Sequence, residues 1–565
     1  LPDIKVAAGG YIVLILSSDG VNTPSGYEVL PFALSAQGET VYLSSGGEVI
    51  DCIAIPALEG GMSYGRAGGR DGFGYLSEAT PKKENASELA ERAEKPEAVL
   101  EPGVYNNTGS LSVELRGKGT VRYTLDCTEP TAASPAYKSP IIIDKTTIIR
   151  ARCFEQGHLP SEVLDLSYII NENDKLEVVS LVTEPENLWN YYTGIYEKGP
   201  NADPVFPYVG ANFWQKWEKK ATVAFFASDG TGFSEPCGIR IFGAYSRAAE
   251  KKSFTCFFRG QYGASELKYR LFKDSDLSVY EAFVLRNMGQ DYNRARIRDE
   301  MMTSLVAENT TVDVQKYRPV ILYLNGEYWG IYYIREKINE NYIAGNYNIS
   351  EESVILSVAN GNSSAEYKEL ISYVSRYNLA DEEHYNYVAS KIDIENYIDY
   401  ICAEMYVANT DNGNIRFFKS SELDGKWRWI FYDLDWAFLD FRHNSIFEHL
   451  NPEGTGAMNA FSTRLINSLL KNQNFKEQFL TRMAWQMQNI WTNEKVLGRI
   501  NELKELINDD MKRDCERWEY SYSYWDKQIQ ILITFQENRH EQLYNYIKNY
   551  FSLNDAKMTE LGFQI

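Results

Sequence analysis

Two short polar stretches, NTDNGN at residues 409–414 and YDLDWAF at residues 432–438, determine how this sequence is expected to fold around its chemistry. Between them, residues 415–419 and 427–434 have the composition of two strands. Asp424-Gly425 separates these strands and is typical of a hairpin turn. The hairpin is therefore expected to bring the second stretch back beside the first.

The flanking sequence predicts the elements that hold this hairpin. Apolar residues recur with a helical period over residues 394–408, so we expect a helix that ends near Asn409. Residues 318–333 indicate a second hairpin, which turns at Asn325-Gly326. Beyond Ser462 the helical period continues toward the C-terminus, which predicts a helical C-terminal lobe.

Carboxylates of the two stretches are expected to converge. Side chains two positions apart in a strand lie on one face, which places Asp433 beside Asp435. Neighbouring carboxylates repel unless they are neutralised, and Mg²⁺ binds such oxygens. Asp411 and Asn414 would join them, as in phosphoryl transfer, where one Asp orients the acceptor and an Asn and another Asp hold the metal. The alternative is a surface hairpin whose acidic residues cap turns.

Composition bounds the class of protein. The chain has 565 residues, enough for about three to five domains. Its formal net charge of −21 argues against nucleic acid or an anionic membrane as partner. No apolar run approaches the roughly 20 residues of a membrane span. The chain starts at Leu1, so we expect an export signal outside this sequence, and Cys127 and Cys153 are open to a disulfide bridge.

The N-terminal third is expected to form two small all-β sandwich domains, at residues 1–88 and 102–171, joined by a linker at 89–101. The first resembles the lamin-tail domain in residues 32–35, 38–43, 63–66, 71–72 and 80–81 with Asn85. The second resembles the domain that follows chitobiases and hexosaminidases in residues 123–126, 128–131, 140–141 and 149–151. Both resemblances imply accessory modules that act as spacers or contact glycans and cell surfaces.

Residues 172–565 are similar to the CotH kinases, atypical protein kinases named for a spore-coat protein. The resemblance covers the loop and strand end quoted above, and residues 238–247, 251–254, 285–289 and 297–299. Tyr432 stands where the family has Trp, and Leu439 where it tends to have Gly. The resemblance implies an α+β kinase-like domain in which Asp411 is catalytic.

The same resemblance implies the ligands of ATP and of Mg²⁺ or Mn²⁺. Asn414, Asp433 and Asp435 would bind metal, with Asp435 as a second ligand or a support. Four basic residues are candidates for the triphosphate: Arg240, Arg247, Lys252 and Arg298. Solvated surface charges are the alternative for these four. Glu336 follows the second hairpin and is a candidate nucleotide contact or a structural residue. An ordinary kinase or P-loop enzyme is excluded, because the sequence has neither glycine-rich signature.

We therefore predict an ATP- and metal-dependent kinase that phosphorylates Ser or Thr of a protein substrate, in a secreted or cell-surface bacterial protein. The alternative is a catalytically degenerate kinase-like protein that adheres to glycans or surfaces. Transfer of a group other than phosphoryl also stays open. A glycoside hydrolase is ranked last, because it needs two carboxylates that flank a sugar.

Overall fold

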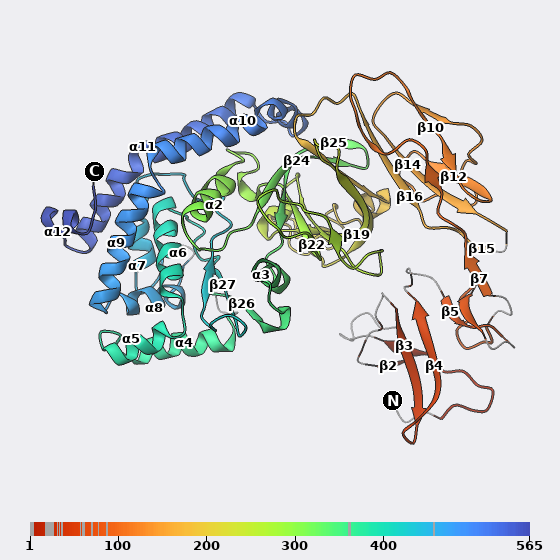
Figure 1. Cartoon of the computed structure of the whole chain (residues 1–565), viewed down its shortest axis with the longest axis horizontal. Helices are drawn as coiled ribbons and strands as arrows, with labels where there is room; N and C mark the ends of the chain where they lie inside the picture. Colours follow the sequence, from red (N-terminus) through yellow and green to blue (C-terminus); the bar gives the residue numbers. More distant parts are fainter. Residues whose placement is uncertain are drawn as a thin grey trace.

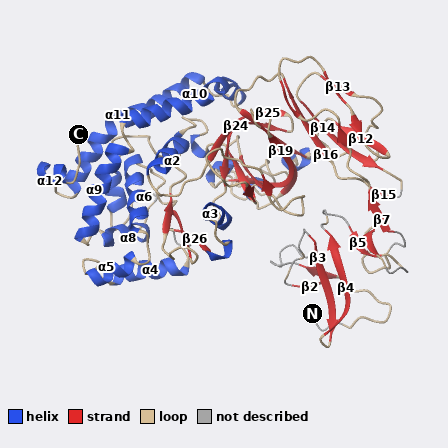
Figure 2. Cartoon of the chain, viewed as in Figure 1, coloured by secondary structure: helices blue, strands red, loops and turns tan. Residues whose placement is uncertain are grey.

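The computed structural model describes residues 5–16, 27–30, 32, 34, 38–56, 58, 63–68, 72–76, 78–85, 89–156, 158–359, 363–455 and 458–564. β-rich modules form the N-terminal side, a β-barrel lies in the middle and helices form the C-terminal side (Figure 1). Figure 2 shows the same division as strands and helices. The expected order, a β-rich N-terminal region before a large α+β region with a helical C-terminal part, is confirmed.

The first module consists of short strands. β3 and β4 form its longest hairpin, and β1 pairs in parallel with β2. Ala33, Ser35 and Asp71, which carry part of the lamin-tail resemblance, lie outside the described residues. The strands are β1 Leu14–Leu16, β2 Glu28–Leu30, β3 Gly38–Ser45, β4 Glu48–Pro56, β5 Ser63–Arg66 and β6 Phe73–Leu76.

The segment predicted as a linker at 89–101 contains strands instead. β7 (Leu89–Arg92) pairs with β6 and with β15 (His158–Leu159) of the second module. β8 (Glu97–Ala98) pairs with β11 (Leu115–Arg116). Ala93 is buried, and its N–H donates to the Leu159 carbonyl (2.9 Å). Backbone pairing holds this segment, which its Glu- and Ala-rich side chains did not indicate.

The second module is a sandwich with a buried apolar interior. Two of its sheets have the orders β12-β14-β16-β9 and β10-β13, and β11 forms a third with β8. The sulfurs of Cys127 and Cys153 are free, and Cys127 instead donates to the Asn325 carbonyl of the barrel (3.6 Å). The strands are β9 Gly103–Tyr105, β10 Leu111–Val113, β12 Thr120–Thr124, β13 Ile141–Ile143, β14 Thr147–Phe154 and β16 Leu164–Ile170.

A closed barrel of order β17-β18-β19-β20-β23-β25-β24 follows. Its first strand pairs in parallel with β24, so the sheet has no free edge there. The predicted Asn325-Gly326 turn is confirmed, with both residues at positive φ (51° and 82°) between β24 and β25. The strands are β17 Glu177–Thr183, β18 Lys219–Phe226, β19 Gly232–Phe242, β20 Ser253–Phe257, β23 Ala282–Arg286, β24 Tyr317–Leu324 and β25 Glu327–Glu336.

The sandwich is fixed to the barrel by contacts of both polar and apolar residues. Ser167 and Ser180 share a hydrogen bond between their hydroxyls (2.8 Å), and Arg150 reaches Glu184 (3.1 Å). Cys127 joins a small buried cluster that includes Val182 of β17. Residues 171–176, which connect the two units, are also held from α10. The junction is therefore braced on several sides.

The helical region packs around α6 (Ile394–Val407), the helix predicted to end near Asn409. Asp393 caps its start, and Ala408 at φ 52° ends it. Twelve of its residues are buried, as expected for a central helix. The other helices are α1 Pro185–Trp189, α2 Arg298–Asn309, α3 Glu340–Tyr347, α4 Ala365–Arg376, α5 Glu382–Ala389, α7 Ser445–Leu450, α8 Ala460–Leu469, α9 Gln473–Asn489, α10 Asn493–Arg517, α11 Tyr522–Tyr550 and α12 Asp555–Glu560.

A small sheet of order β26-β27-β28 lies against these helices. It comprises β26 (Val354–Val358), β27 (Arg416–Ser420) and β28 (Arg428–Ile430). Asp424-Gly425 lies within the β27–β28 connection, as predicted, and Gly425 has a φ of 69°. A further two-stranded sheet joins β21 (Leu267–Lys268) to β22 (Val279–Tyr280). Within the described part of the chain, no helix has both the length and the apolar character needed to cross a bilayer.

Candidate active site

The two aspartates of the second stretch meet at one guanidinium, although not for the reason expected. β28 ends at Ile430, short of the predicted end at residue 434, and Asp433 has a left-handed φ of 61°. The strand alternation used for Asp433 and Asp435 is therefore wrong. Their carboxylates converge because Arg286, at the end of β23, donates to both (2.9 and 2.6 Å).

Arg286 belongs to a buried charge network between the barrel and α2. It also donates to Asp299 (3.0 Å), which accepts from Arg335 (2.9 Å). Burial lowers the pKa of Arg286, but Asp435, Asp299 and Asp433 together raise it well above its ordinary value. Burial raises the pKa of Asp435 well above its usual range despite the nearby guanidinium. The network thus holds several carboxyls in a space where they would otherwise repel.

The first stretch lies beside this cluster, as predicted. The Asn414 side-chain amide donates to Asp433 (2.6 Å), and its oxygen accepts from the hydroxyl of Tyr432 (2.7 Å). Tyr432, the departure from the family pattern, therefore supplies a hydroxyl that fixes Asn414. Asp411 lies nearby: burial, and then the charge of Asp433, raise its pKa to about 6. The hairpin thus brings Asp411, Asn414 and Asp433 to one place.

A buried glutamate supports the loop from behind. Glu404 of α6 accepts from the side-chain amide of Asn409 (3.3 Å), and the Asp411 N–H donates to the oxygen of Asn409 (3.1 Å). Burial raises the pKa of Glu404 to about 8, so this carboxyl is largely neutral at pH 7. Of the two carboxyls, Glu404 and Asp411, only that of Asp411 is therefore mainly ionised at that pH.

These residues border a cavity of about 470 Å³ that is rich in charge. Its volume lies in the usual range for ligand sites, roughly 300–1,000 Å³. The predicted residues that line it are Arg240, Arg247, Asp411, Asn414, Asp433 and Asp435. The sequence interpretation assigned no role to several other polar residues of the lining, among them Arg286, Arg335, Lys337, Arg416 and Gln290. Arg286 lay inside a stretch that carried the family resemblance, but nothing local indicated its role.

Three predicted nucleotide contacts are not among the described residues that line this cavity. Lys252 donates to the Arg247 and Ala249 carbonyls (both 2.8 Å), and burial lowers its pKa to about 7. Arg298 pairs with Asp291 (2.8 Å) and holds the Phe438 carbonyl (2.8 Å). Both side chains donate to groups inside the protein, although Arg298 Nη2 has no hydrogen-bond partner among the described residues. Because neither residue lines the cavity, their assignment is corrected in favour of structural roles.

Glu336, the third of these, is also buried in a structural position. It accepts from the Lys316 N–H (2.8 Å) and from the Asn346 amide (2.9 Å). Burial raises the pKa of Glu336 despite these donors. Of the two roles the sequence left open for Glu336, the structural one agrees with its position.

The carboxylate and amide oxygens on the cavity wall are of the kind that binds a cation together with the phosphate oxygens of a ligand. Asp433 is about one-third exposed on the cavity wall and lies next to Asn414. Both oxygens of Asp435 accept hydrogen bonds, from Arg286 and from the Gln290 N–H (2.8 Å), and both oxygens of Asp433 accept from Arg286 and Asn414. A cation would therefore have to replace one of these bonds, and the exposed Asp433 is the more accessible of the two. Among the described residues, no group of three or more acidic, His or Cys side chains is arranged to hold a metal. Mg²⁺ commonly takes one or two carboxylates plus phosphate oxygens, and Asp433 with Asn414 fits that pattern.

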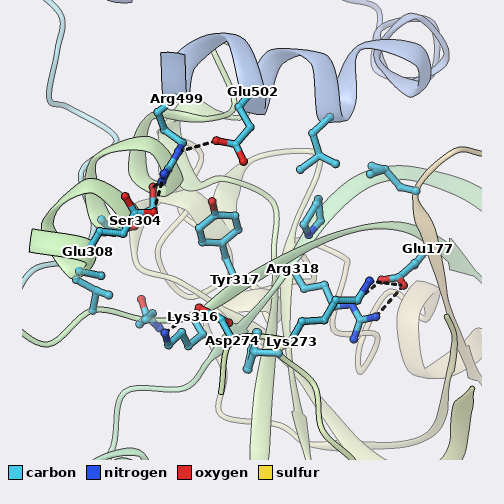
Figure 3. A pocket seen from close by; sticks show the side chains of 18 of the residues that line it. Glu177, Lys273, Asp274, Ser304, Glu308, Lys316, Tyr317, Arg318, Arg499 and Glu502 are labelled. Atoms are coloured by element: carbon cyan, nitrogen blue, oxygen red, sulfur yellow. Dashed lines mark hydrogen bonds and ion pairs between the residues drawn. The ribbon is translucent and has the colours of Figure 1, made fainter. Parts of the chain in front are cut away.

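A larger cavity of about 680 Å³ lies elsewhere, between the barrel, α2 and α10 (Figure 3). Its arginines face acidic partners: Arg318 pairs with Glu177 (2.5 Å), and Arg499 with Glu502 (2.9 Å). Lys316 likewise pairs with Asp274 (2.8 Å). These pairs neutralise the basic groups, and none of the residues predicted for the site is among the described residues that line this cavity.

Comparison with known families gives two matches. The model of the CotH kinase protein family matches residues 239–543, and that of the chitobiase/beta-hexosaminidase C-terminal domain matches residues 100–165. A search of curated proteins found no match. The first matched range includes Arg286, Asp411, Asn414, Asp433 and Asp435. The lamin-tail resemblance of residues 1–88 stays a prediction.

Proposed function

The chain belongs to the CotH kinase protein family, and from that premise we propose that it is an ATP- and divalent-metal-dependent kinase of Ser or Thr hydroxyls. One observation carries the proposal. Asp411, Asn414 and Asp433 converge on the wall of a charged cavity of about 470 Å³. Phosphoryl transfer uses the same three groups: one Asp that orients the acceptor, here Asp411, and an Asn and a second Asp that hold the metal, here Asn414 and Asp433.

Asp411 is the residue that acts on the acceptor hydroxyl. Its pKa of about 6 keeps it mainly ionised at pH 7, yet close enough to neutrality to accept a proton. Asp411 lines both this cavity and a neighbouring one, so it can face ATP in the first and the acceptor in the second. It orients the hydroxyl and takes its proton.

Asn414 and Asp433 would hold the cation, which supplies charge neutralisation to the phosphates. Arg286 fixes Asp433 and Asp435 in place and prevents their mutual repulsion. Lys337 and Arg416 line the same cavity and would attract the triphosphate. Arg240 and Arg247 also line it, although Arg240 pairs with Glu218 (3.2 Å) and Arg247 donates to the Gly243 carbonyl (2.7 Å). Positioning and electrostatics thus supply the acceleration.

One observation favours the alternative, a degenerate scaffold that binds surfaces. Arg286 pairs with both Asp433 and Asp435, so the acidic cluster is partly neutralised by the protein itself. A kinase-like fold that had lost its cation would need such a substitute. Binding of ATP with a cation therefore separates the two functions.

The test measures ATP binding and phosphate transfer in three proteins. Wild type is expected to be stabilised by ATP with Mg²⁺ or Mn²⁺, by about 2.7 kcal/mol at a hundred times the Kd. Asp411→Asn is expected to keep that stabilisation and to lose about 10²- to 10⁴-fold in transfer to Ser- and Thr-containing acceptors. Asp433→Asn is expected to lose the cation-dependent part of ATP binding.

Asp440→Asn is the matched control, because Asp440 is an exposed acid a few residues further on that pairs only with nearby groups such as Arg442. It is expected to behave as wild type. Equal transfer by all four proteins would refute the assignment of Asp411. Absence of stabilisation by ATP and cation in wild type would favour the scaffold.

A further inference from the structure

A second cavity of about 550 Å³ adjoins the first and shares Asp411 with it. Four aromatic residues line it: Phe206, Tyr245, Tyr292 and Trp436. The described lining contains no Lys or Arg, whereas the first cavity contains several. The second cavity is therefore suited to an apolar group and not to a phosphate.

Its outer wall consists of two exposed rings, Phe206 on a loop and Tyr245 on the turn after β19. Phe206 and Tyr245 are each 58% exposed, and their ring centroids lie 6.3 Å apart. The Val205 N–H donates to Asp203 (2.8 Å), and the Trp214 indole donates to the Pro207 carbonyl (2.8 Å). These bonds fix the loop on both sides of Phe206. Large aromatic rings held open to water are typical of sites that a partner covers.

Its inner wall belongs to the catalytic loops themselves. The Thr410 N–H and hydroxyl donate to the Trp436 carbonyl (3.3 and 3.1 Å), and Arg294 stacks on the Trp436 ring at 4.3 Å. Thr410 precedes Asp411, and Trp436 follows Asp435. A group seated against Trp436 is thus next to the carboxylate that orients the acceptor.

We propose that this aromatic cavity is the acceptor site, and that it takes a polypeptide segment with an aromatic or large aliphatic side chain near the phosphorylated Ser or Thr. The inference rests on the proposed kinase function and names the substrate class of that same site. In the step it implies, the acceptor oxygen bonds to the γ-phosphorus of ATP and its proton passes to Asp411. The bond from that phosphorus to the bridging oxygen breaks, and ADP leaves with the electron pair.

The lining favours a peptide side chain over a sugar. A sugar needs many hydrogen-bonding groups to replace the water around its hydroxyls. Here the Thr410 hydroxyl is already bonded to the Trp436 carbonyl. The other polar groups of the described lining are the side chains of Ser246, Gln290 and Asp411, together with the hydroxyls of the two tyrosines and the indole N–H. An apolar side chain next to one hydroxyl matches that set.

The experiment measures binding of labelled peptides to the full chain, with Mg²⁺ and a non-hydrolysable ATP analogue. Each peptide carries one Ser, with Phe or Ala at each of three positions on either side. At one or more positions the Phe peptide is expected to bind at least about tenfold more tightly than its Ala partner. Phe206→Ala is expected to remove that preference and to leave analogue binding unchanged.

Tyr192→Ala is the matched control, since Tyr192 is 67% exposed on the preceding segment and is not among the residues lining this cavity. It is expected to keep the preference. Equal binding of Phe and Ala peptides by a protein that binds the analogue would overturn the acceptor site and leave the kinase standing. Failure to bind the analogue would remove both. Displacement of the Phe peptide by a chitooligosaccharide would make this a sugar site and also overturn the inference.

Discussion

The two cavities that meet at Asp411 have opposite walls. The first holds guanidinium and carboxylate groups that neutralise one another inside the protein, with Arg286 at the centre. The second presents two aromatic rings to solvent, Phe206 on the loop at residues 203–214 and Tyr245 on the turn after β19. The charged groups of the first wall therefore stabilise the fold, whereas the exposed rings of the second wall contribute little to its stability. Substitutions in the two walls should therefore differ in what they damage.

Arg286→Ala should have the largest effect, because it removes the shared partner of the buried Asp299 and Asp435 and of the partly exposed Asp433. Breaking a buried ion pair in this way costs about 3–5 kcal/mol. We expect a loss of that size in the free energy of unfolding, measured by urea denaturation. Arg259→Ala is the control, since Arg259 is half exposed in its pair with Glu218 and should lose under about 1 kcal/mol. Similar losses in the two variants would erase the distinction.

Asp411→Asn should increase the free energy of unfolding, whereas Arg286→Ala should lower it. The folded protein raises the pKa of Asp411 from 3.8 to about 6, so the folded state holds the proton more tightly than the unfolded state. This contribution to stability is present at low pH and is lost as the pH rises through about 6. The variant should therefore be more stable than wild type by about 1–3 kcal/mol at pH 8, and by less at pH 5.

Urea denaturation of both proteins at the two pH values measures this effect. Asp440→Asn is again the control, because the pKa of Asp440 is lowered by its bonds to the Arg442 backbone and side chain. It should not gain stability at pH 8. A variant of Asp411 that is destabilised equally at both pH values would contradict the burial of that charge.

Tyr432→Phe should have a smaller effect, confined to the cation. It removes the hydroxyl that holds the Asn414 oxygen, a bond worth about 1 kcal/mol. We expect the concentration of Mg²⁺ at half-maximal ATP binding to rise about fivefold, with the unfolding free energy changed by about 1 kcal/mol or less. Tyr245→Phe, a Tyr on the wall shared by the two cavities, tests whether loss of any hydroxyl there has the same result. An unchanged Mg²⁺ requirement in Tyr432→Phe would show that Asn414 is held without it.

Phe206→Ala should have the smallest effect on stability. Its ring is mostly exposed, and exposed substitutions commonly change the unfolding free energy by no more than about 0.5 kcal/mol. Denaturation should therefore not separate it from wild type, even where peptide binding is lost. A loss above about 2 kcal/mol would mean that the aromatic wall supports the fold as well.

Local sequence features predicted the parts of the site that local physics controls. The helical period placed the end of α6 next to Asn409, and Asp424-Gly425 and Asn325-Gly326 placed two turns. Because the hairpin is short, it brought Asp411, Asn414 and Asp433 together without knowledge of the rest of the fold. The cluster was right even though Asp433 is not in a strand.

The rest depended on contacts between distant residues. Arg286 is 147 positions from Asp433, and no local pattern relates them. Lys252 and Arg298 have the charge that a phosphate site needs, but only the fold shows that they donate to carbonyls and to Asp291 away from the first cavity. The parallel pairing of β17 with β24 closes the barrel across well over a hundred residues. Phe206 gave no signal, since an isolated aromatic residue in a loop is ordinary.

The contacts between the sandwich and the barrel hold these two units in a fixed relative position. Ser167 and Ser180 join strands on either side of the junction, and Arg513 holds Glu172 and Asp174 between them. A ligand bound by the sandwich would therefore be held at a fixed distance and orientation from the loop at residues 409–414. For the proposed kinase, the distance between a target bound by the sandwich and the acceptor would therefore be set by the folded chain and not by a flexible tether.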